Sequence, residues 1–183
     1  MRKPIAFTLN GERVEAQVAP HETLVEVLRE EFGLYGARES CGQGLCGCCT
    51  VLVDGDARVA CVTPAVRVDS RAVTTVEGLD SATRDSLAGS FVGTGGSQCG
   101  FCTPGIVMRA ASLLAKGRTR RADVDRGLAA HLCRCTGWQT VYEAIDAAAS
   151  EVVDAAASEV VDAAASRRVA APRTDLDATA RRA

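Results

Sequence analysis

The sequence predicts an α+β protein, in which a small β-sheet domain with one helix precedes a helical domain. Two short strand patterns flank Asn10-Gly11, the strongest short signal for a tight hairpin turn. Strand signals recur until Gly78 and are then replaced by helix signals. We therefore predict one domain over residues 1–78 and a second over residues 79–149.

The first domain is expected to contain a hairpin, one helix and three further strands. Residues 4–18 alternate apolar and polar side chains around the Asn10-Gly11 turn, which is typical of half-buried strands. Thr23 and Glu26 have the spacing of a capping box, so a helix is predicted over about 23–32. The later strands are predicted from β-branched content and turn signals at Thr50–Val53, Arg58–Val62 and Ala72–Val76.

The second domain is predicted to consist of four helices, of which the first covers Ser81–Phe91. Thr103-Pro104 has the pattern of an N-cap followed by proline at the first helical position, and Gly117 supplies the stop. Thr136 and Gln139 form a second capping box, which predicts the start of the last helix. The helix between them is marked by Val124, Leu128 and Leu132.

The C-terminal tail, residues 150–183, is predicted to be an exposed Ala-rich helical extension that becomes disordered after Arg167. DAAASEVV at residues 146–153 is repeated at residues 154–161. A period of eight rotates the valine pair by about 80° per copy, so no single apolar face persists. No function is assigned to this segment.

Composition and charge argue against nucleic acid and membranes as partners. The chain has 183 residues, 47% of them hydrophobic, and a net charge of -2. No Lys/Arg-rich run is long enough for an anionic surface, and no apolar run approaches the roughly 18 residues of a membrane span. The N-terminus lacks the apolar stretch of a secretory signal. We therefore expect a cytoplasmic protein.

Nine cysteines are the main chemical signal of the sequence, and eight of them fall in tight groups. In a reducing compartment an odd number of grouped cysteines is poorly explained by disulfides. Metal ligation or redox chemistry explains it better.

The first group has the plant-type ferredoxin spacing of a [2Fe-2S] cluster, Cys-x4-Cys-x2-Cys with a later cysteine. Soft, anionic thiolates stabilise ferric iron, and the interleaved glycines let the backbone loop around it. This pattern selects Cys41, Cys46, Cys49 and Cys61. Cys48 is left over as a neighbouring free thiol, although spacing alone also allows it to replace Cys49.

The second group consists of two pairs, Cys99 with Cys102 and Cys133 with Cys135. Each pair lies just before a predicted helix N-terminus, where unpaired amides favour thiolates and an anionic cluster. Four cysteines in two pairs also suit a structural zinc site. The plant-type pattern in the same chain favours a second iron-sulfur cluster.

The motifs ESCGQGLCGCCTV, Cys61, QCGFCTPG and LCRCTGW follow one another in an order and spacing that resemble one known family. This is the iron-sulfur small subunit of the molybdenum hydroxylases, which include xanthine dehydrogenase, aldehyde oxidoreductase and carbon monoxide dehydrogenase. The resemblance covers residues 4–149. It implies a ferredoxin-like β-grasp domain followed by a four-helix bundle domain. It also implies one [2Fe-2S] cluster on Cys41, Cys46, Cys49 and Cys61, and another on Cys99, Cys102, Cys133 and Cys135.

The resemblance further implies an electron-transfer subunit without catalytic residues of its own. Electrons would pass from a molybdopterin-binding large subunit through both clusters to an FAD-binding medium subunit, within a dimer of heterotrimers. Gln98 would contact the molybdopterin from this chain. Trp138 and His131 stand where the family often has Tyr and Asn.

Two other functions fit parts of the sequence. A free-standing ferredoxin-like carrier would need only the first cysteine group, and a zinc-stabilised interaction module would use the second without redox chemistry. The two histidines, His21 and His131, are interpreted as surface or core residues, because lone histidines are seldom ligands.

Overall fold

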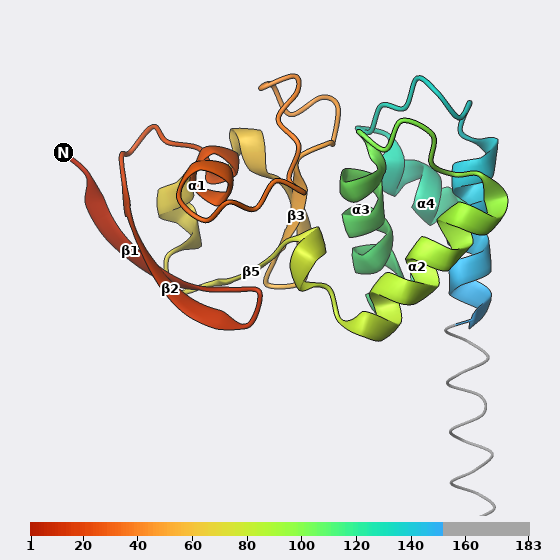
Figure 1. Ribbon diagram of the computed structural model, residues 1–183, viewed down its shortest axis with the longest axis horizontal. Helices are drawn as coiled ribbons and strands as arrows, with labels where there is room; N and C mark the ends of the chain where they lie inside the picture. Colours follow the sequence, from red (N-terminus) through yellow and green to blue (C-terminus); the bar gives the residue numbers. More distant parts are fainter. Residues whose placement is uncertain (152–183) are drawn as a thin grey trace, which may run out of the picture. The chain divides into compact units, whose positions relative to one another are not determined.

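The computed structural model of the chain describes residues 1–151, which confirm the predicted α+β class (Figure 1). Residues Met1–Ala149 form one compact unit. Nearly all of the predicted Ala-rich tail lies outside the described residues. No helix in the described part of the chain is long and apolar enough to cross a membrane.

A five-stranded mixed sheet with the order β2-β1-β5-β3-β4 forms the N-terminal part. β1 and β5 run parallel, and the other neighbours are antiparallel. The parallel pair brings the start of the chain beside a strand more than sixty residues later. The strands are β1 Lys3–Leu9, β2 Glu12–Val18, β3 Thr50–Val53, β4 Asp56–Val59 and β5 Ala72–Thr74.

The β1–β2 hairpin confirms the prediction at Asn10-Gly11. Both turn residues have positive φ, 51° and 89°, as a two-residue turn with the twist of the flanking strands requires. The Asn10 side chain also reaches the end of a neighbouring strand, since its amide donates to Thr75 Oγ1 at 3.1 Å and its Oδ1 accepts from the Thr75 N–H at 2.9 Å. The turn is thereby tied to the end of β5.

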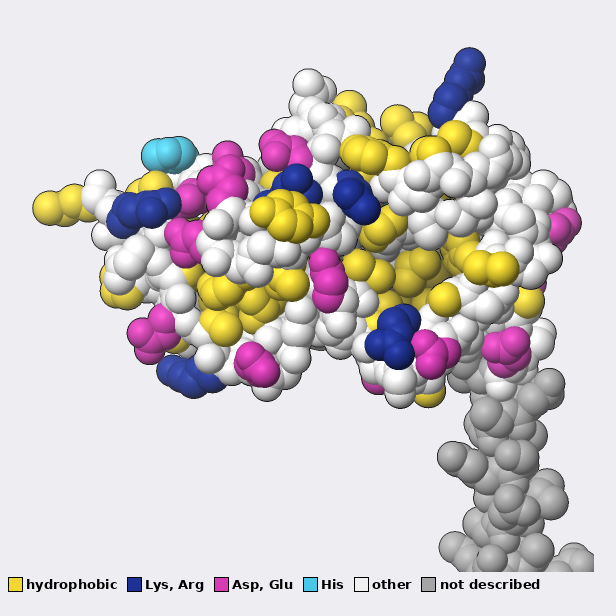
Figure 2. All heavy atoms as spheres, in the orientation of Figure 1, with side chains coloured by type: hydrophobic (Ala, Val, Ile, Leu, Met, Phe, Trp, Pro, Cys, Tyr) yellow, Lys and Arg dark blue, Asp and Glu magenta, His cyan; other side chains and the backbone are white. Residues whose placement is uncertain are grey.

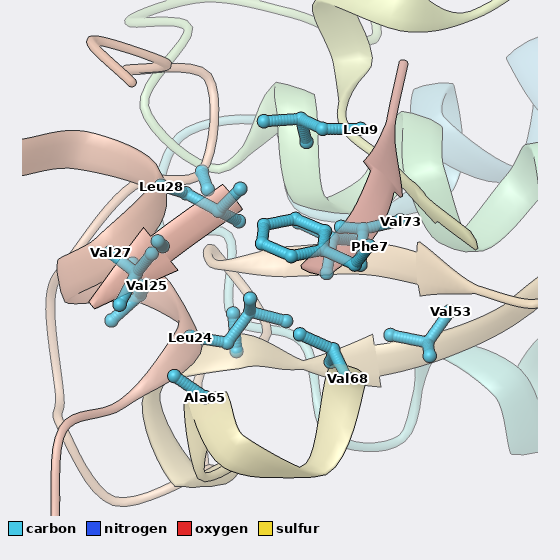
Figure 3. Close-up of a cluster of buried hydrophobic side chains, with 14 of the residues drawn as sticks. Phe7, Leu9, Leu24, Val25, Val27, Leu28, Val53, Ala65, Val68 and Val73 are labelled. Carbon is cyan, nitrogen blue, oxygen red and sulfur yellow. The ribbon is translucent and has the colours of Figure 1, made fainter. Parts of the chain in front are cut away.

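Helix α1, Leu24–Glu30, lies where the capping box predicted it. Its apolar side packs on the sheet, and Figure 3 shows Leu24 and Leu28 beside Phe7 in the resulting core. Phe7 also meets Phe32 edge to face, with ring centroids 5.9 Å apart. Burial of this apolar side, more than helix propensity, stabilises so short a helix.

Removing the α1 cap is expected to destabilise the first core. Thr23 Oγ1 accepts from the Glu26 N–H at 3.4 Å, and Glu26 Oε2 accepts from the Thr23 N–H at 2.7 Å. Thr23→Ala should therefore lower the free energy of unfolding by about 1 kcal/mol. A urea titration measures this loss, and an unchanged midpoint would contradict the capping role.

The same cap should make stability depend on pH. The backbone and side-chain hydrogen bonds from Thr23 lower the pKa of Glu26 from its ordinary value of 4.5. The contribution of ionised Glu26 to the free energy of unfolding is therefore complete above pH 4.5, and it is lost as the pH falls through the lowered pKa of Glu26 in the folded protein. Glu26→Gln is the control, because glutamine preserves the cap but carries no charge. The free energy of unfolding of this variant should fall less between neutral and acidic pH than that of the wild type.

The predicted strand at Arg58–Val62 is wrong in its second half, and the predicted strand at Ala72–Val76 is too long. β4 ends at Val59, and Ala60–Val62 forms a 3-10 turn, η1. The Ala60 N–H still donates to the Cys49 carbonyl at 3.2 Å, in register with the β3–β4 pairs, and the chain then turns where the Thr63 N–H donates to the Ala60 carbonyl at 3.3 Å. Two further 3-10 turns that were not predicted are η2 Ala65–Val68 and η3 Val76–Gly78.

Five helical segments occur in the described chain, and four of them build a second hydrophobic core after residue 78. The largest fully buried side chains of this core are Leu87, Ile106, Met108 and Ile145. Its helices are α2 Ser81–Thr94, α3 Thr103–Ala115, α4 Arg121–Leu128 and a segment over 139–151.

Three predicted details of these helices are wrong. Thr103 is the first residue of α3 rather than its cap, and the N-cap is Cys102. Leu132 lies beyond α4 and is 63% exposed. Thr136 caps no helix, because its Oγ1 lies 3.1 Å from Cys133 Sγ and accepts weakly from the Trp138 N–H at 3.4 Å. All three residues lie within three positions of a predicted cysteine ligand.

Candidate iron-sulfur sites

The first cysteine set lies in the loop between α1 and β3, with its last member in η1. Backbone amides point at the sulfur atoms: the N–H groups of Gln43 and Leu45 each donate to Cys41 Sγ at 3.4 Å. Mainly through the Gln43 amide, these bonds lower the pKa of Cys41 to about 6. A loop that turns its amides toward sulfur is suited to hold an anionic cluster.

Neighbouring thiols of this first set affect one another's pKa. Cys46 acts on Cys41 and on Cys48, and Cys61 acts on Cys49. The Cys61 N–H also donates to Cys49 Sγ at 3.4 Å. Burial raises the pKa of Cys49 to about 12, so iron must displace a proton from this thiol on binding.

The second cysteine set is built from two loops of the helical part. Cys99 and Cys102 precede α3, and Cys133 and Cys135 lie between α4 and the segment over 139–151. Neighbouring thiols affect one another's pKa here too, Cys133 that of Cys102 and Cys99 that of Cys135. Cys99 and Cys135 are exposed, whereas the other two are half-buried. The site therefore has a buried side and a side that is open to solvent.

The pKa values of the two half-buried thiols of this set shift in opposite directions. Burial raises the pKa of Cys102 to about 12. Burial also acts to raise the pKa of Cys133, but bonds from Thr136 and from neighbouring groups lower it overall. Thr136, expected to cap a helix, thus serves the cysteine site.

The four thiols of each set could serve either of two metal groups. A tetrahedral zinc site needs four ligands around one atom, whereas a [2Fe-2S] cluster takes two protein ligands on each of two irons. The backbone amides directed at Cys41 and Cys49 favour an anionic cluster at the first set.

Cys48, predicted to be a bystander, is buried between the two sets. Its thiol donates to the Cys46 carbonyl at 3.7 Å. Burial raises its pKa to about 12, with smaller contributions from Cys46, Cys102 and Cys49. This surplus thiol thus contacts the backbone of one ligand candidate, Cys46, and is close enough to Cys102 of the second set for the charge of that thiol to affect it.

Gln98, the predicted pterin contact, lies in the loop that joins α2 to α3. Its side chain is exposed, as is that of the adjacent Cys99. Just before it, Ser97 Oγ lies 2.9 Å from Thr103 Oγ1, which connects the loop to the first residue of α3. The Gln98 amide is thus presented to solvent beside the exposed side of the second cysteine set.

The two cysteine loops also contact each other, mainly through residues other than the predicted ligands. The Leu132 N–H donates to the Cys46 carbonyl at 3.0 Å. His131 Nε2 lies 3.3 Å from Thr50 Oγ1. Burial, and to a lesser degree the Arg109 charge, lowers the pKa of His131 to about 4, so the ring is neutral near pH 7. The one feature of the sequence that points to a role for His131 at the site is its position two residues before Cys133.

Two family models match the chain, one after the other. The model described as "2Fe-2S iron-sulfur cluster binding domain" matches residues 7–73. The model described as "[2Fe-2S] binding domain" matches residues 75–146. Each match contains one complete cysteine set.

Curated relatives resemble the chain over most of their length. The nicotine 6-hydroxylase small subunit of Paenarthrobacter nicotinovorans is 40% identical over 79% of this chain and 88% of that protein. The xanthine dehydrogenase iron-sulfur-binding subunit of Escherichia coli O157:H7 is 38% identical over 77% of this chain and 91% of that protein.

Solved structures agree with these relatives. A chain of quinoline 2-oxidoreductase from Pseudomonas putida 86 is 38% identical, with a TM-score of 0.73 over 81% of this chain and 94% of that chain. Aldehyde oxidoreductase from Desulfovibrio gigas is 35% identical, with a TM-score of 0.76 over 84% of this chain and 17% of that longer one.

Proposed function

Because the chain belongs to the family of iron-sulfur subunits of the molybdenum hydroxylases, we propose that it is the electron-transfer subunit of such an oxidoreductase. The observation that carries this proposal is the division of eight cysteines into two sets of four, each inside one matched iron-sulfur model. Substrate chemistry would take place on another chain.

We assign the ligands of the two clusters from the two sets of four cysteines. When bound, each [2Fe-2S] cluster supplies a centre that takes up and releases one electron. The amides of Gln43, Leu45 and Cys61 stabilise the negative charge on the sulfur atoms of the first set. The proposed ligands are Cys41, Cys46, Cys49 and Cys61 for the first cluster, and Cys99, Cys102, Cys133 and Cys135 for the second.

We further propose the partners and the finer architecture. Residues 1–78 would form the β-grasp domain and residues 79–149 a four-helix bundle domain. The partners would be a molybdopterin-binding large subunit and an FAD-binding medium subunit, assembled in the cytoplasm as a dimer of heterotrimers. Electrons would run from molybdopterin through both clusters to FAD.

Exposed apolar side chains beside both cysteine sets support the proposal of partner chains. Leu45 and Val62 flank the first set and are 61% and 53% exposed, whereas Phe101 and Leu132 flank the second and are 44% and 63% exposed. Figure 2 shows hydrophobic side chains along the upper edge, where Figure 1 places the loops. Apolar surface of this kind is typical of a docking face.

Purification from the native host tests the proposed assembly. The chain should be recovered in stoichiometric amounts with two larger chains, molybdenum and flavin. A stable monomer that carries iron but neither molybdenum nor flavin would instead identify a free-standing carrier.

Gln98→Ala tests the proposed pterin contact in the assembled enzyme. Loss of one hydrogen bond to the cofactor should change the molybdenum EPR signal and lower substrate turnover by about tenfold, corresponding to about 1.4 kcal/mol. The iron-sulfur signals should stay as they are. Gln43→Ala is the matched control, since only the backbone of Gln43 contacts sulfur. An unaltered molybdenum signal in Gln98→Ala would contradict the assignment.

A further inference from the structure

A hydrogen-bonded chain of three residues connects the two cysteine loops. Thr50 Oγ1 donates to the Gly47 carbonyl at 2.7 Å, which commits its only proton. The same oxygen must therefore accept from His131 Nε2 at 3.3 Å, and this places the imidazole proton on Nε2. Both residues are buried, with exposed fractions of 2% for Thr50 and 4% for His131. A bond in such a place is costly to break.

Close packing against the backbone of Gly47 also fixes the position of the His131 imidazole. Gly47 has a φ of +68°, and a Cβ at this position would collide with the His131 ring and lie 2.7 Å from the Ala130 carbonyl. Only glycine therefore lets the ring pack directly on the backbone between Cys46 and Cys48. On the next residue, the Leu132 N–H donates to the Cys46 carbonyl at 3.0 Å. Residues 130–132 thus pack against residues 46–47 and form a hydrogen bond with them.

We propose that His131 is a positioning residue, which through Thr50 and Gly47 holds the two cysteine loops at the spacing needed for electron transfer between the clusters. The loops meet through a direct backbone hydrogen bond from the Leu132 N–H to the Cys46 carbonyl. Cys46 is a proposed ligand of the first cluster, and Leu132 directly precedes Cys133, a proposed ligand of the second. The His131–Thr50 hydrogen bond lies beside this backbone hydrogen bond and stabilises it. This inference rests on the two-cluster function proposed above.

Loss of the His131–Thr50 hydrogen bond is expected to weaken the backbone hydrogen bond between Leu132 and Cys46. His131→Ala and Thr50→Val, made in the full assembly, should each accelerate hydrogen exchange of the Leu132 amide by about tenfold, as expected for one lost buried hydrogen bond. Exchange is read by mass spectrometry on a peptide that covers residues 130–136. The EPR interaction between the two reduced clusters should weaken in the same variants.

Rescue and controls separate positioning from general destabilisation. His131→Asn keeps an N–H donor for Thr50, so it should restore both readouts. Ile145→Val removes a methyl group from the second core outside the bridge and should alter neither, although it lowers stability. His21→Ala changes the other histidine, which is exposed, and should have no effect.

The outcomes distinguish this inference from the proposed function. If the wild-type assembly contains two clusters, and His131→Ala and Thr50→Val leave both the exchange and the magnetic interaction unchanged, the positioning role is wrong. Strictly additive effects in the double variant would also overturn it, because bonded partners should show coupling. A wild-type assembly with fewer than two clusters would contradict the proposed function itself.

Discussion

Gly105→Ala is expected to destabilise the protein and to disturb the first cysteine loop, although Gly-to-Ala changes in helices usually stabilise. A Cβ at Gly105 in α3 would collide with the Gly47 carbonyl oxygen and lie 2.9 Å from the Cys48 Cα. Both are backbone atoms between proposed ligands, so no flexible side chain can move aside. The gain of about 1 kcal/mol in helix propensity should be outweighed by an overpacking cost of about 3 kcal/mol.

Gly89→Ala provides the matched control for this prediction. Gly89 is exposed within α2, and a Cβ there would meet no heavy atom within 4 Å. This variant should gain about 0.5–1 kcal/mol in the free energy of unfolding. Denaturant titration and iron content should both distinguish the two variants. Equal stabilisation by both changes would show that the contact between α3 and the cysteine loop is not tight.

Cys49→Ser is expected to abolish the first cluster while leaving the second in place. Cys49 pairs with Cys61, whose N–H donates to its sulfur. A serine hydroxyl is a harder and far less acidic ligand than a thiol, so one iron of the cluster would lose a thiolate. Iron content should fall from about four to about two atoms per chain. One of the two EPR signals of the reduced protein should disappear.

Cys48→Ser is the control that tests the choice between adjacent cysteines. The Cys48 thiol donates to the Cys46 carbonyl, and a serine hydroxyl can make the same bond. Both clusters should therefore assemble, with about four iron atoms per chain. A fall to about two iron atoms in this variant, with normal content in Cys49→Ser, would reverse the ligand assignment.

Local chemistry explains which elements could be predicted from the sequence. The Asn10-Gly11 turn and the Thr23–Glu26 cap act within a few residues of themselves, and both appear in the structure where the pattern placed them. The change from strands to helices after Gly78 is likewise a property of composition along the chain. Such features need no knowledge of distant contacts.

Long-range contacts explain the errors. The predicted strand stops at Val59, because the Thr63 N–H donates to the Ala60 carbonyl in a 3-10 turn and the Thr63 carbonyl accepts from the distant Leu24 N–H. Leu132 lies outside the predicted helix, and its N–H donates to Cys46 in the other cysteine loop. In both places an apolar pattern typical of regular structure is overridden by a bond to a distant segment, and no periodicity records such a bond.

The site shows the same division. Spacing grouped the cysteines, and the structure adds which backbone amides donate to the sulfur atoms, those of Gln43 and Leu45 to Cys41 and that of Cys61 to Cys49. The bridge of His131 and Thr50 could not be predicted, because the two residues are 81 positions apart and a lone histidine carries no pattern.

Iron analysis with low-temperature EPR of the dithionite-reduced native assembly tests the central claim most directly. We predict about four iron atoms per chain and two distinct [2Fe-2S] signals, in a complex that also contains molybdenum and flavin. About two iron atoms, a single signal and stoichiometric zinc in the second cysteine set would contradict the two-cluster function.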